Sequence, residues 1–228
     1  MNDASINDSR RFSGTISSFR QKRGKRLALL IRNLSSRLRR PVNILDVGGR
    51  AEYWNNVGFD GIGSISILNS DETDLSRAIE PSGGAGLFEY QIGDARNLGT
   101  IRSDTIDLVH SNSVIEHVGV WEDMEAMASE LRRVGVAGWV QTPAWEFPIE
   151  PHFRVPFMHW FSAPVRRKFL VLSKRYRNQG FGERRRHADR INLLSKRETA
   201  FLFPACKIDT ERAFSLPKSY IITWDRTE

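Results

Sequence analysis

The segment of residues 44–50, Ile-Leu-Asp-Val-Gly-Gly-Arg, constrains the fold of this chain more than any other stretch. Its apolar residues suit a short strand that is covered on both faces, as in a parallel sheet. Gly48 and Gly49 lack a Cβ, so the backbone after the strand can turn tightly and approach a ligand closely. The pattern predicts a strand that ends at a ligand crevice beside Asp46, although the same residues also occur in plain turns.

Strand-like and helix-like segments alternate downstream of this turn. Such alternation predicts an α/β fold, a parallel sheet wound by right-handed crossovers. A short link at residues 216–218 makes the final two strands antiparallel, because a parallel return needs a longer crossover. The expected strands are 44–47, 63–68, 88–92, 106–110, 138–142, 206–212 and 219–224, and the expected helices are 51–57, 121–133 and 195–203.

Length and composition agree with one α/β domain that carries additions. The chain has 228 residues, 40% of them hydrophobic, which suffices for a buried core. The single Cys206 cannot form an internal disulfide, which favours a reducing compartment. No apolar run approaches membrane-spanning length, and the N-terminus lacks the apolar centre of a secretion signal. We therefore expect a soluble, cytoplasmic protein.

The net charge of +7 is unevenly distributed along the chain. Residues 1–41 carry eleven Lys and Arg against two Asp and Glu, and residues 166–190 carry ten against two. Residues 42–165 carry seven against eighteen, a net charge of −11. The central unit is thus acidic, which argues against nucleic acid as its main partner.

The N-terminal part divides into a polar tail and a helix. Residues 1–23 are polar and basic, and we expect a disordered tail before a single domain at residues 24–228. From Lys25 to Leu38 apolar residues recur at three- and four-residue steps, which predicts a basic amphipathic helix. Such a helix can make a weak contact with an anionic membrane or can cover the sheet, and the second arrangement is far commoner.

Polar side chains follow three of the expected strands. Asp46, Asn69 and Asp94 stand at strand ends that converge on one crevice in an open parallel sheet. Asn69 lies where a ribose-binding residue is needed, and Asp94 can accept a hydrogen bond from the amine of an adenine. Each residue alone is typical of a strand-end cap, but their joint spacing favours an adenosyl ligand.

The chain resembles class I S-adenosylmethionine-dependent methyltransferases of the small-molecule type over about residues 42–224. The resemblance rests on residues 44–49, on Gly-Asp-Ala-Arg at 93–96 and, most specifically, on Asp-Leu-Val-His-Ser-Asn-Ser-Val-Ile-Glu-His at 107–117. It implies a Rossmann-like, seven-stranded, mostly parallel sheet with an antiparallel last strand and helices on both faces.

The resemblance also implies S-adenosyl-L-methionine as cofactor and assigns residues to it. It places Asp46, Gly48 and Gly49 at the methionine side, Asn69 at the ribose, Asp94 and Ala95 at the adenine, and Ser111 and Asn112 beside the sulfonium. Arg50 and Ala51 depart from the usual third glycine, and the neutral Asn69 stands where an acid is usual. Because an amide makes weaker hydrogen bonds than a carboxylate, we expect modest cofactor affinity.

Methyl transfer from a sulfonium needs mainly alignment of the reactants and exclusion of water. A general base is needed when the acceptor is a hydroxyl or a protonated amine. The candidates are His117, beside Glu116, and His152, although each can instead have a structural role; His110 is expected inside the sheet. Their spacing fits no metal site, so we expect no bound metal.

Residues 144–190 follow the fifth strand, where they can cover the crevice. Their aromatic side chains and basic run suit a lipid-linked or anionic acceptor, although the same rings can simply pack a helical cover. The acceptor that we expect is a small-molecule or glycan/lipid-like one. Residues 111–114, Ser-Asn-Ser-Val, lack the Asn/Asp-Pro-Pro-aromatic run expected of a methylase that acts on base amines. We therefore expect a methyltransferase that acts on such an acceptor at oxygen.

Two other hypotheses stay open. A nucleotide-binding oxidoreductase has a similar sheet, but residues 48–51, Gly-Gly-Arg-Ala, lack the G-x-G-x-x-G spacing. A non-catalytic binding protein that kept the fold without turnover is compatible with the neutral Asn69. The sequence indicates no oligomeric state.

Overall fold

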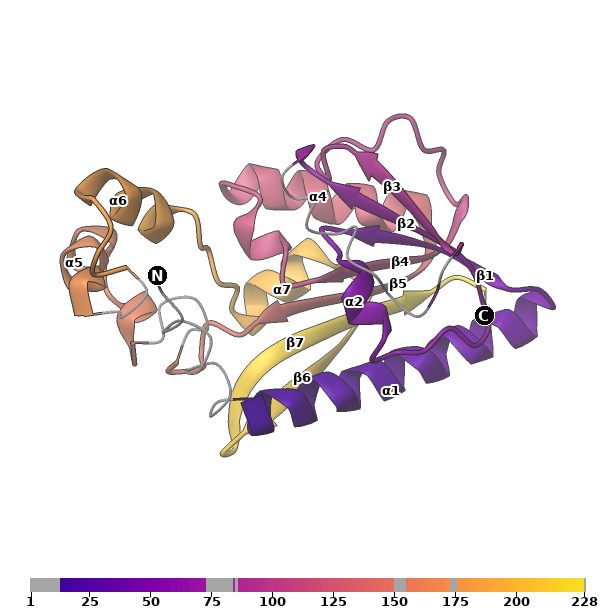
Figure 1. Ribbon diagram of the computed structural model, residues 1–228, viewed down its shortest axis with the longest axis horizontal. Coiled ribbons are helices and arrows are strands. Elements are labelled where there is room, and N and C mark those ends of the chain that lie inside the picture. Colours follow the sequence, from indigo (N-terminus) through magenta and orange to yellow (C-terminus); the bar gives the residue numbers. More distant parts are fainter. Residues whose placement is uncertain (1–12, 73–83, 85, 150–154, 173–175, 228) are drawn as a thin grey trace, which may run out of the picture.

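Seven strands form one sheet in the order β3-β2-β1-β4-β5-β7-β6 (Figure 1). The computed structural model describes residues 13–72, 84, 86–149, 155–172 and 176–227. The first five strands are parallel, and β7 is antiparallel to both β5 and β6, so the predicted α/β class is confirmed. The strands are β1 (Val42–Val47), β2 (Ile62–Asn69), β3 (Phe88–Ile92), β4 (Ile106–Asn112), β5 (Gly135–Pro143), β6 (Lys207–Ala213) and β7 (Leu216–Asp225).

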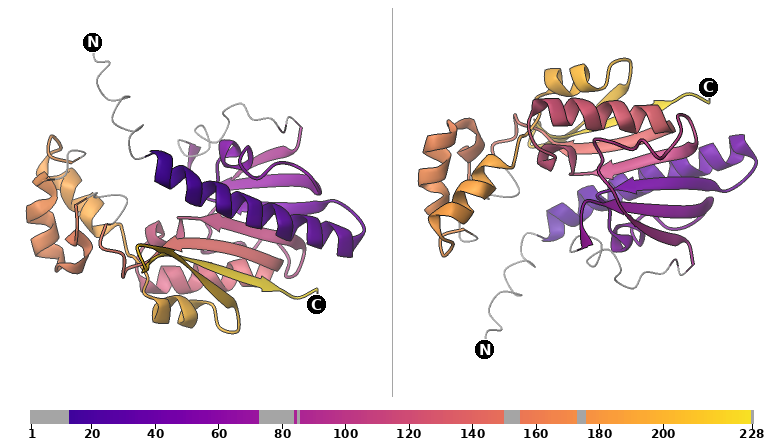
Figure 2. Two further views of the ribbon diagram at one scale, coloured as in Figure 1. Left: turned by 90° about the horizontal axis from the view of Figure 1, so that it is seen from below. Right: turned by 90° about the horizontal axis from the view of Figure 1, so that it is seen from above.

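Helices cover both faces of the sheet (Figures 1 and 2). On one face lie α1 (Ser13–Leu38) and α2 (Ala51–Trp54), and on the other lie α4 (Trp121–Val134) and α7 (Lys196–Leu202). None of the described helices is long and apolar enough to cross a membrane.

Helix α1 packs on the sheet through the predicted apolar stripe. Leu27, Ile31 and Leu34 are fully buried in the same core as the apolar side chains of β1 and β2. The helix begins at Ser13 rather than at Lys25, so residues 13–23 are helical and the expectation of a disordered tail there is wrong. Residues 1–12 lie outside the described residues.

A helical segment follows β5 and projects from the end of the sheet (Figures 1 and 2). It has its own small core, formed by Met158, Leu170, Tyr176 and Ile191. We call residues 155–191 the α5–α6 lobe. Its helical elements are η2 (Met158–Trp160), α5 (Ala163–Phe169), η3 (Leu170–Leu172) and α6 (Phe181–Asp189).

The turn between the last two strands differs from the expected link. Residues 216–218 belong to β7, and the turn is formed by Phe214 and Ser215, which have positive φ angles of 50° and 67°. Two successive residues with positive φ are typical of the type I′ turn that joins two-residue hairpins.

Candidate functional site

A cavity of about 1240 Å³ lies at the carboxyl ends of β1, β2 and β4. The α5–α6 lobe contributes Tyr176, Arg190 and Ile191 to its wall. Ser111, expected beside a ligand, is fully buried and is not among the lining residues. The other predicted cofactor residues all line the cavity: Asp46, Gly48, Gly49, Asn69, Asp94, Ala95 and Asn112.

The turn after β1 needs both of its glycines, for different reasons. Gly48 has a φ of +70°, a conformation that residues with a Cβ rarely adopt, and a Cβ there would lie 2.5 Å from Val114 Cγ2. At Gly49 a Cβ would lie 1.9 Å from the Asp46 carboxylate. The turn therefore presents bare backbone to the cavity, and any side chain at either position would displace a neighbour.

Asp46 is held inside the protein rather than directed at a ligand. Its Oδ2 accepts a hydrogen bond from Trp54 Nε1 at 2.7 Å, and its Oδ1 lies 2.6 Å from His110 Nδ1. Asp46 also lines the cavity, and its expected role at the methionine side of a cofactor stays a prediction. His110, expected inside the sheet, lines the cavity, and its Nε2 is buried without a hydrogen-bond partner among the described residues.

Tyr53 of α2 lies against His110. The two ring centroids are 4.9 Å apart, and Tyr53 also lines the cavity. Burial raises the pKa of Tyr53 to about 12, so its hydroxyl stays neutral at physiological pH. Sequence reasoning placed neither ring at the site, because their position depends on how α2 packs and on the register of β1 and β4, which pairs Asp46 with His110.

Asn69 stands at the end of β2 and is almost fully buried. Its side-chain nitrogen donates a hydrogen bond to the Gly49 carbonyl oxygen at 3.3 Å. The amide thereby ties β2 to the glycine turn. Because the side-chain nitrogen is used in this bond, the side-chain oxygen of Asn69 is the atom that can accept a hydrogen bond.

Asp94 lies after β3 in a chain of charged side chains. Arg96 donates to both Asp94 oxygens, with Nε–Oδ1 at 2.9 Å and Nη2–Oδ2 at 2.7 Å. The Arg96 hydrogen bond lowers the pKa of Asp94, so this carboxyl stays ionised. Arg96 also reaches Asp123 at 2.8 Å, and Asp123 accepts from the Val120 backbone at the start of α4.

The tip of β4 is linked to α1. Asn112 accepts a hydrogen bond from Arg23 Nη1 at 3.0 Å, and Arg23 also lies 3.5 Å from the Glu211 carboxylate. The next residue, Ser113, has a positive φ of 58° and donates to Gln141 at 2.9 Å. Arg23 was not expected at the site, because its place depends on how α1 packs.

Of the two candidate bases, His117 lines the cavity. Its side chain is 36% exposed, and its Nε2 lies 4.0 Å from the fully buried Glu116 carboxylate. Glu116 also accepts a hydrogen bond from Thr142 at 3.1 Å. His152 lies outside the described residues.

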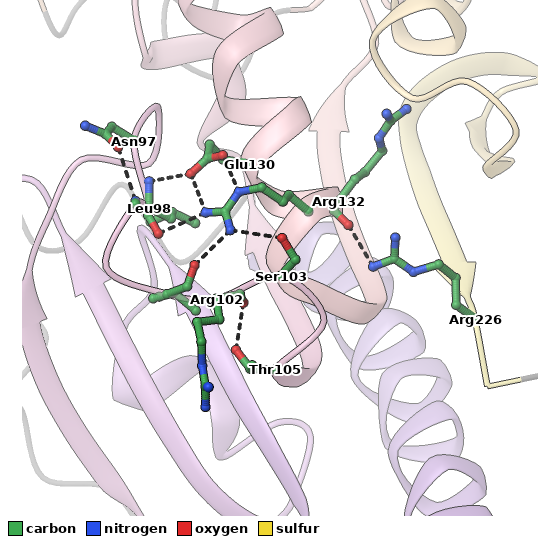
Figure 3. A network of polar contacts seen from close by, with 11 residues as sticks. Asn97, Leu98, Arg102, Ser103, Thr105, Glu130, Arg132 and Arg226 are labelled. Carbon is green, nitrogen blue, oxygen red and sulfur yellow. Dashed lines mark hydrogen bonds and ion pairs between the residues drawn. The ribbon is translucent and has the colours of Figure 1, made fainter.

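A polar network away from the cavity holds the loop that follows Asp94 (Figure 3). Arg133 donates to the Glu130 carboxylate at 2.6 and 2.8 Å and to the carbonyl oxygens of Ile101 and Leu98 at 2.8 and 3.0 Å. Glu130 also accepts from the Leu98 backbone nitrogen at 2.6 Å. The last turns of α4 thereby fix the segment between the Asp94 region and β4.

Comparison with known proteins gives one family match. Residues 46–138 match the family model described as a methyltransferase domain. This range contains the glycine turn, Asn69, Asp94 and the tip of β4. No curated protein sequence matches the chain.

Solved structures share the fold at low sequence identity. The PH0226 protein from Pyrococcus horikoshii OT3 is 14% identical with a TM-score of 0.54, over 98% of this chain and 93% of that chain. The N-terminal domain of EvdMO1, solved in the presence of SAH and D-fucose, is 17% identical with a TM-score of 0.52, over 87% and 82%. The CurJ carbon methyltransferase is 12% identical with a TM-score of 0.53, over 81% and 48%.

Proposed function

We propose that this chain, whose residues 46–138 match the methyltransferase domain model, is an S-adenosylmethionine-dependent methyltransferase that methylates an oxygen of a small glycan- or lipid-like molecule. The observation that carries the proposal is that the glycine turn, Asn69 and Asp94 line one cavity. When bound, the cofactor supplies an electrophilic methyl group on a sulfonium.

The residues of the cavity fit this cofactor. The bare backbone of Gly48 and Gly49 leaves the space in which the methionine part can lie against the turn. In this proposal the Asn69 side-chain oxygen accepts a hydrogen bond from a ribose hydroxyl. In this proposal the ionised Asp94, with Ala95 beside it, accepts a hydrogen bond from the adenine amine. Asn112 completes the wall at the tip of β4.

Asp46 has a positioning role in this proposal. Its carboxylate fixes Trp54 and His110 through hydrogen bonds of 2.7 and 2.6 Å. His110, held in this way, forms part of the cavity wall. The Asp46 carboxylate therefore acts on the ligand indirectly, by fixing the His110 imidazole.

The size and walls of the cavity support a second molecule beside the cofactor. A volume of about 1240 Å³ exceeds the usual range of roughly 300–1,000 Å³ for a single ligand pocket. An aromatic, a cationic and an apolar side chain, Tyr176, Arg190 and Ile191, form the wall on the lobe side. The presence of D-fucose with the EvdMO1 domain is compatible with a sugar-like acceptor here.

We assign proton removal from the acceptor hydroxyl to His117. Its imidazole lines the cavity, and the buried Glu116 carboxylate at 4.0 Å stabilises the imidazolium that forms when the ring accepts the proton. General-base catalysis of this kind contributes typically about 100-fold or more to the rate.

Calorimetry tests the cofactor assignment. We expect saturable heat on titration with S-adenosylhomocysteine and none with NAD. Heat with NAD alone would contradict the assignment and favour the oxidoreductase hypothesis. Tight S-adenosylhomocysteine binding without methyl-donor consumption, over a panel of sugar and lipid hydroxyl acceptors, would favour the non-catalytic hypothesis.

Steady-state kinetics with an acceptor that the chain methylates test the role of His117. We expect His117→Ala to lower kcat by about 100-fold and to leave S-adenosylhomocysteine affinity within about twofold. His117→Gln, which keeps polarity without basicity, should behave like the alanine variant. An unchanged rate in either variant would remove His117 from the mechanism.

A further inference from the structure

The α5–α6 lobe has two faces with different neighbours. One side contributes Tyr176, Arg190 and Ile191 to the cavity wall. The rest projects away from the sheet, beyond the layers formed by α1 and α4 (Figures 1 and 2). The lobe is therefore placed to meet a partner while it borders the site.

Large apolar side chains are exposed on this lobe. Two pairs of rings lie in contact, with centroids 5.0 Å apart for Phe157 and Trp160 and 6.4 Å apart for Phe161 and Phe169. Exposed apolar side chains that gather in this way mark interaction surfaces. The side chains that are 43–68% exposed are Phe157, Trp160, Phe161, Phe169, Val171 and Phe181.

The backbone at Phe157, whose ring is exposed, has an uncommon conformation. Phe157 has a φ of +62°, in the left-handed region that bulky residues rarely adopt. Its nitrogen donates to the Pro148 carbonyl oxygen at 2.6 Å, which holds the turn. Strain of this kind gathers at binding and switch regions, because a purely structural turn can use glycine instead.

Cationic side chains accompany these rings. The acids of the lobe are Glu183 and Asp189, and Asp189 pairs with Arg167 at 2.8 Å and with Arg185 at 3.6 Å. The lobe therefore keeps a clear excess of positive charge. Its cations in the described residues are Arg166, Arg167, Lys168, Arg177, Arg184, Arg185, Arg186 and Arg190.

Helix α1 cannot present an amphipathic face to a membrane. Its apolar stripe, with Leu27, Ile31 and Leu34 at 0% exposure, is packed on the sheet. A membrane contact through that stripe, which the sequence left open, is therefore excluded by the packing. On the lobe, exposed rings and cations occur together.

We propose that the α5–α6 lobe docks onto an anionic lipid bilayer. Aromatic rings combined with long cationic side chains are what interfacial segments place in the headgroup region. Lys and Arg near the surface are attracted to acidic headgroups. The docking itself is independent of the reaction. Its consequence rests on the proposed function, because docking would bring the cavity close to an acceptor that is carried by a lipid.

The observations favour a bilayer over the other polyanions. A nucleic acid would need aromatic faces for stacking, whereas Phe157 packs on Trp160 and Phe161 on Phe169. The acidic residues 42–154, which precede the lobe, also repel a long polyanion. A planar surface meets the projecting lobe without approaching that acidic part.

Sedimentation with vesicles tests the proposal on the full chain. We expect binding to phosphatidylcholine vesicles that contain phosphatidylserine, little binding to pure phosphatidylcholine, and loss of binding as salt is raised. No sedimentation with either vesicle, as for a lobe that binds an acidic protein, would overturn it. So would tighter binding to an oligonucleotide than to the anionic vesicles.

Paired variants locate the surface. We expect Lys168→Glu with Arg186→Glu, and separately Phe161→Ser with Phe169→Ser, to weaken vesicle binding by about tenfold or more. The charge-matched control is Lys25→Glu with Arg32→Glu on α1, and the ring control is Phe201→Ser on α7, which is 65% exposed. An equal loss in either control would refute the location on the lobe.

Calorimetry with S-adenosylhomocysteine separates the two proposals. None of the altered residues lines the cavity, so the affinity of each variant should match that of the original chain. A chain that binds anionic vesicles but no S-adenosylhomocysteine would contradict the proposed function alone. The reverse result would contradict the docking alone.

Discussion

The Asn69 side chain donates a hydrogen bond to the Gly49 carbonyl oxygen, with 3.3 Å between nitrogen and oxygen. A carboxylate at this position has no proton to donate, so it would place two oxygens against each other. The neutral residue is therefore fitted to this turn, where similar methyltransferases usually carry an acid. In the proposed complex, the amide would bind the ribose less strongly than a carboxylate, but it makes the hydrogen bond that fixes the turn.

The first prediction concerns this exchange. Restoring the usual acid with Asn69→Asp should weaken S-adenosylhomocysteine binding by about 2- to 10-fold, the value of one lost hydrogen bond. Calorimetry measures the change, with Asn33→Asp on the exposed side of α1 as the charge-matched control. Tighter binding in Asn69→Asp would show that the bond to Gly49 does not decide the residue type.

The second prediction concerns the space at the turn. Gly49→Ala would put a Cβ 1.9 Å from the Asp46 carboxylate, so the turn or Asp46 with its two partners must move. Overpacking costs about 1–3 kcal/mol, and we expect S-adenosylhomocysteine affinity to fall by about 10- to 100-fold. Gly180→Ala is the matched control, because a Cβ there meets nothing within 4 Å. Unchanged affinity in Gly49→Ala would refute this placement of the cofactor.

The third prediction concerns pH. Because Arg96 lowers the pKa of Asp94, the Asp94 carboxylate stays ionised near neutral pH. It becomes protonated only as the pH falls through that lowered pKa. In Arg96→Ala the pKa returns upward, so the loss of S-adenosylhomocysteine affinity on acidification should begin at a higher pH. Titrations from pH 7 toward pH 4, with circular dichroism to confirm folding, measure this shift. Arg102→Ala in the next loop should keep the original profile.

The fourth prediction concerns the network that α4 makes with the loop after Asp94. Arg133→Met keeps the methylene groups and removes the bonds to Glu130 and to two loop carbonyl groups. We expect the free energy of unfolding to fall by about 1–3 kcal/mol. Urea unfolding measures it, with Arg132→Met on the same helix as control. A loss no larger than that of the control would mean that the loop is held by other contacts.

Elements whose signals are local were predictable. β3 spans Phe88–Ile92 as expected. Helix α7 was expected at residues 195–203 and begins after Ser195. The Ser195 hydroxyl accepts from the Glu198 nitrogen, and the Glu198 carboxylate accepts from the Ser195 nitrogen, which together form a capping box. Each signal lies within a few neighbouring residues, so one sequence contains it.

Contacts between distant segments were not predictable in the same way. Asp46 and His110 are 64 residues apart, and their contact depends on the register of β1 and β4. Arg23 reaches Asn112 only because α1 crosses the tip of β4. Reading along one strand identifies the residues at its end, but not the side chains that its neighbour places beside them.

The turn between β6 and β7 was missed for a different reason. Type I′ turns are usually marked by Asn-Gly or Asp-Gly, and here Phe214 and Ser215 adopt the positive φ angles. Because Pro217 is typical of a turn, the link was expected at residues 216–218. Pro217 lies instead at the start of β7, a position that a strand tolerates.

The place of β7 between β5 and β6 has a consequence for how the chain is made. Ribosomal synthesis delivers β1 to β5 first, and these parallel strands can pair as they emerge. The edge of β5 then stays open until residues 216–225 have left the exit tunnel, and β6 has no strand to join before them. A nascent chain stalled before residue 216 would therefore display an unpaired sheet edge, the feature that recruits chaperones and drives aggregation.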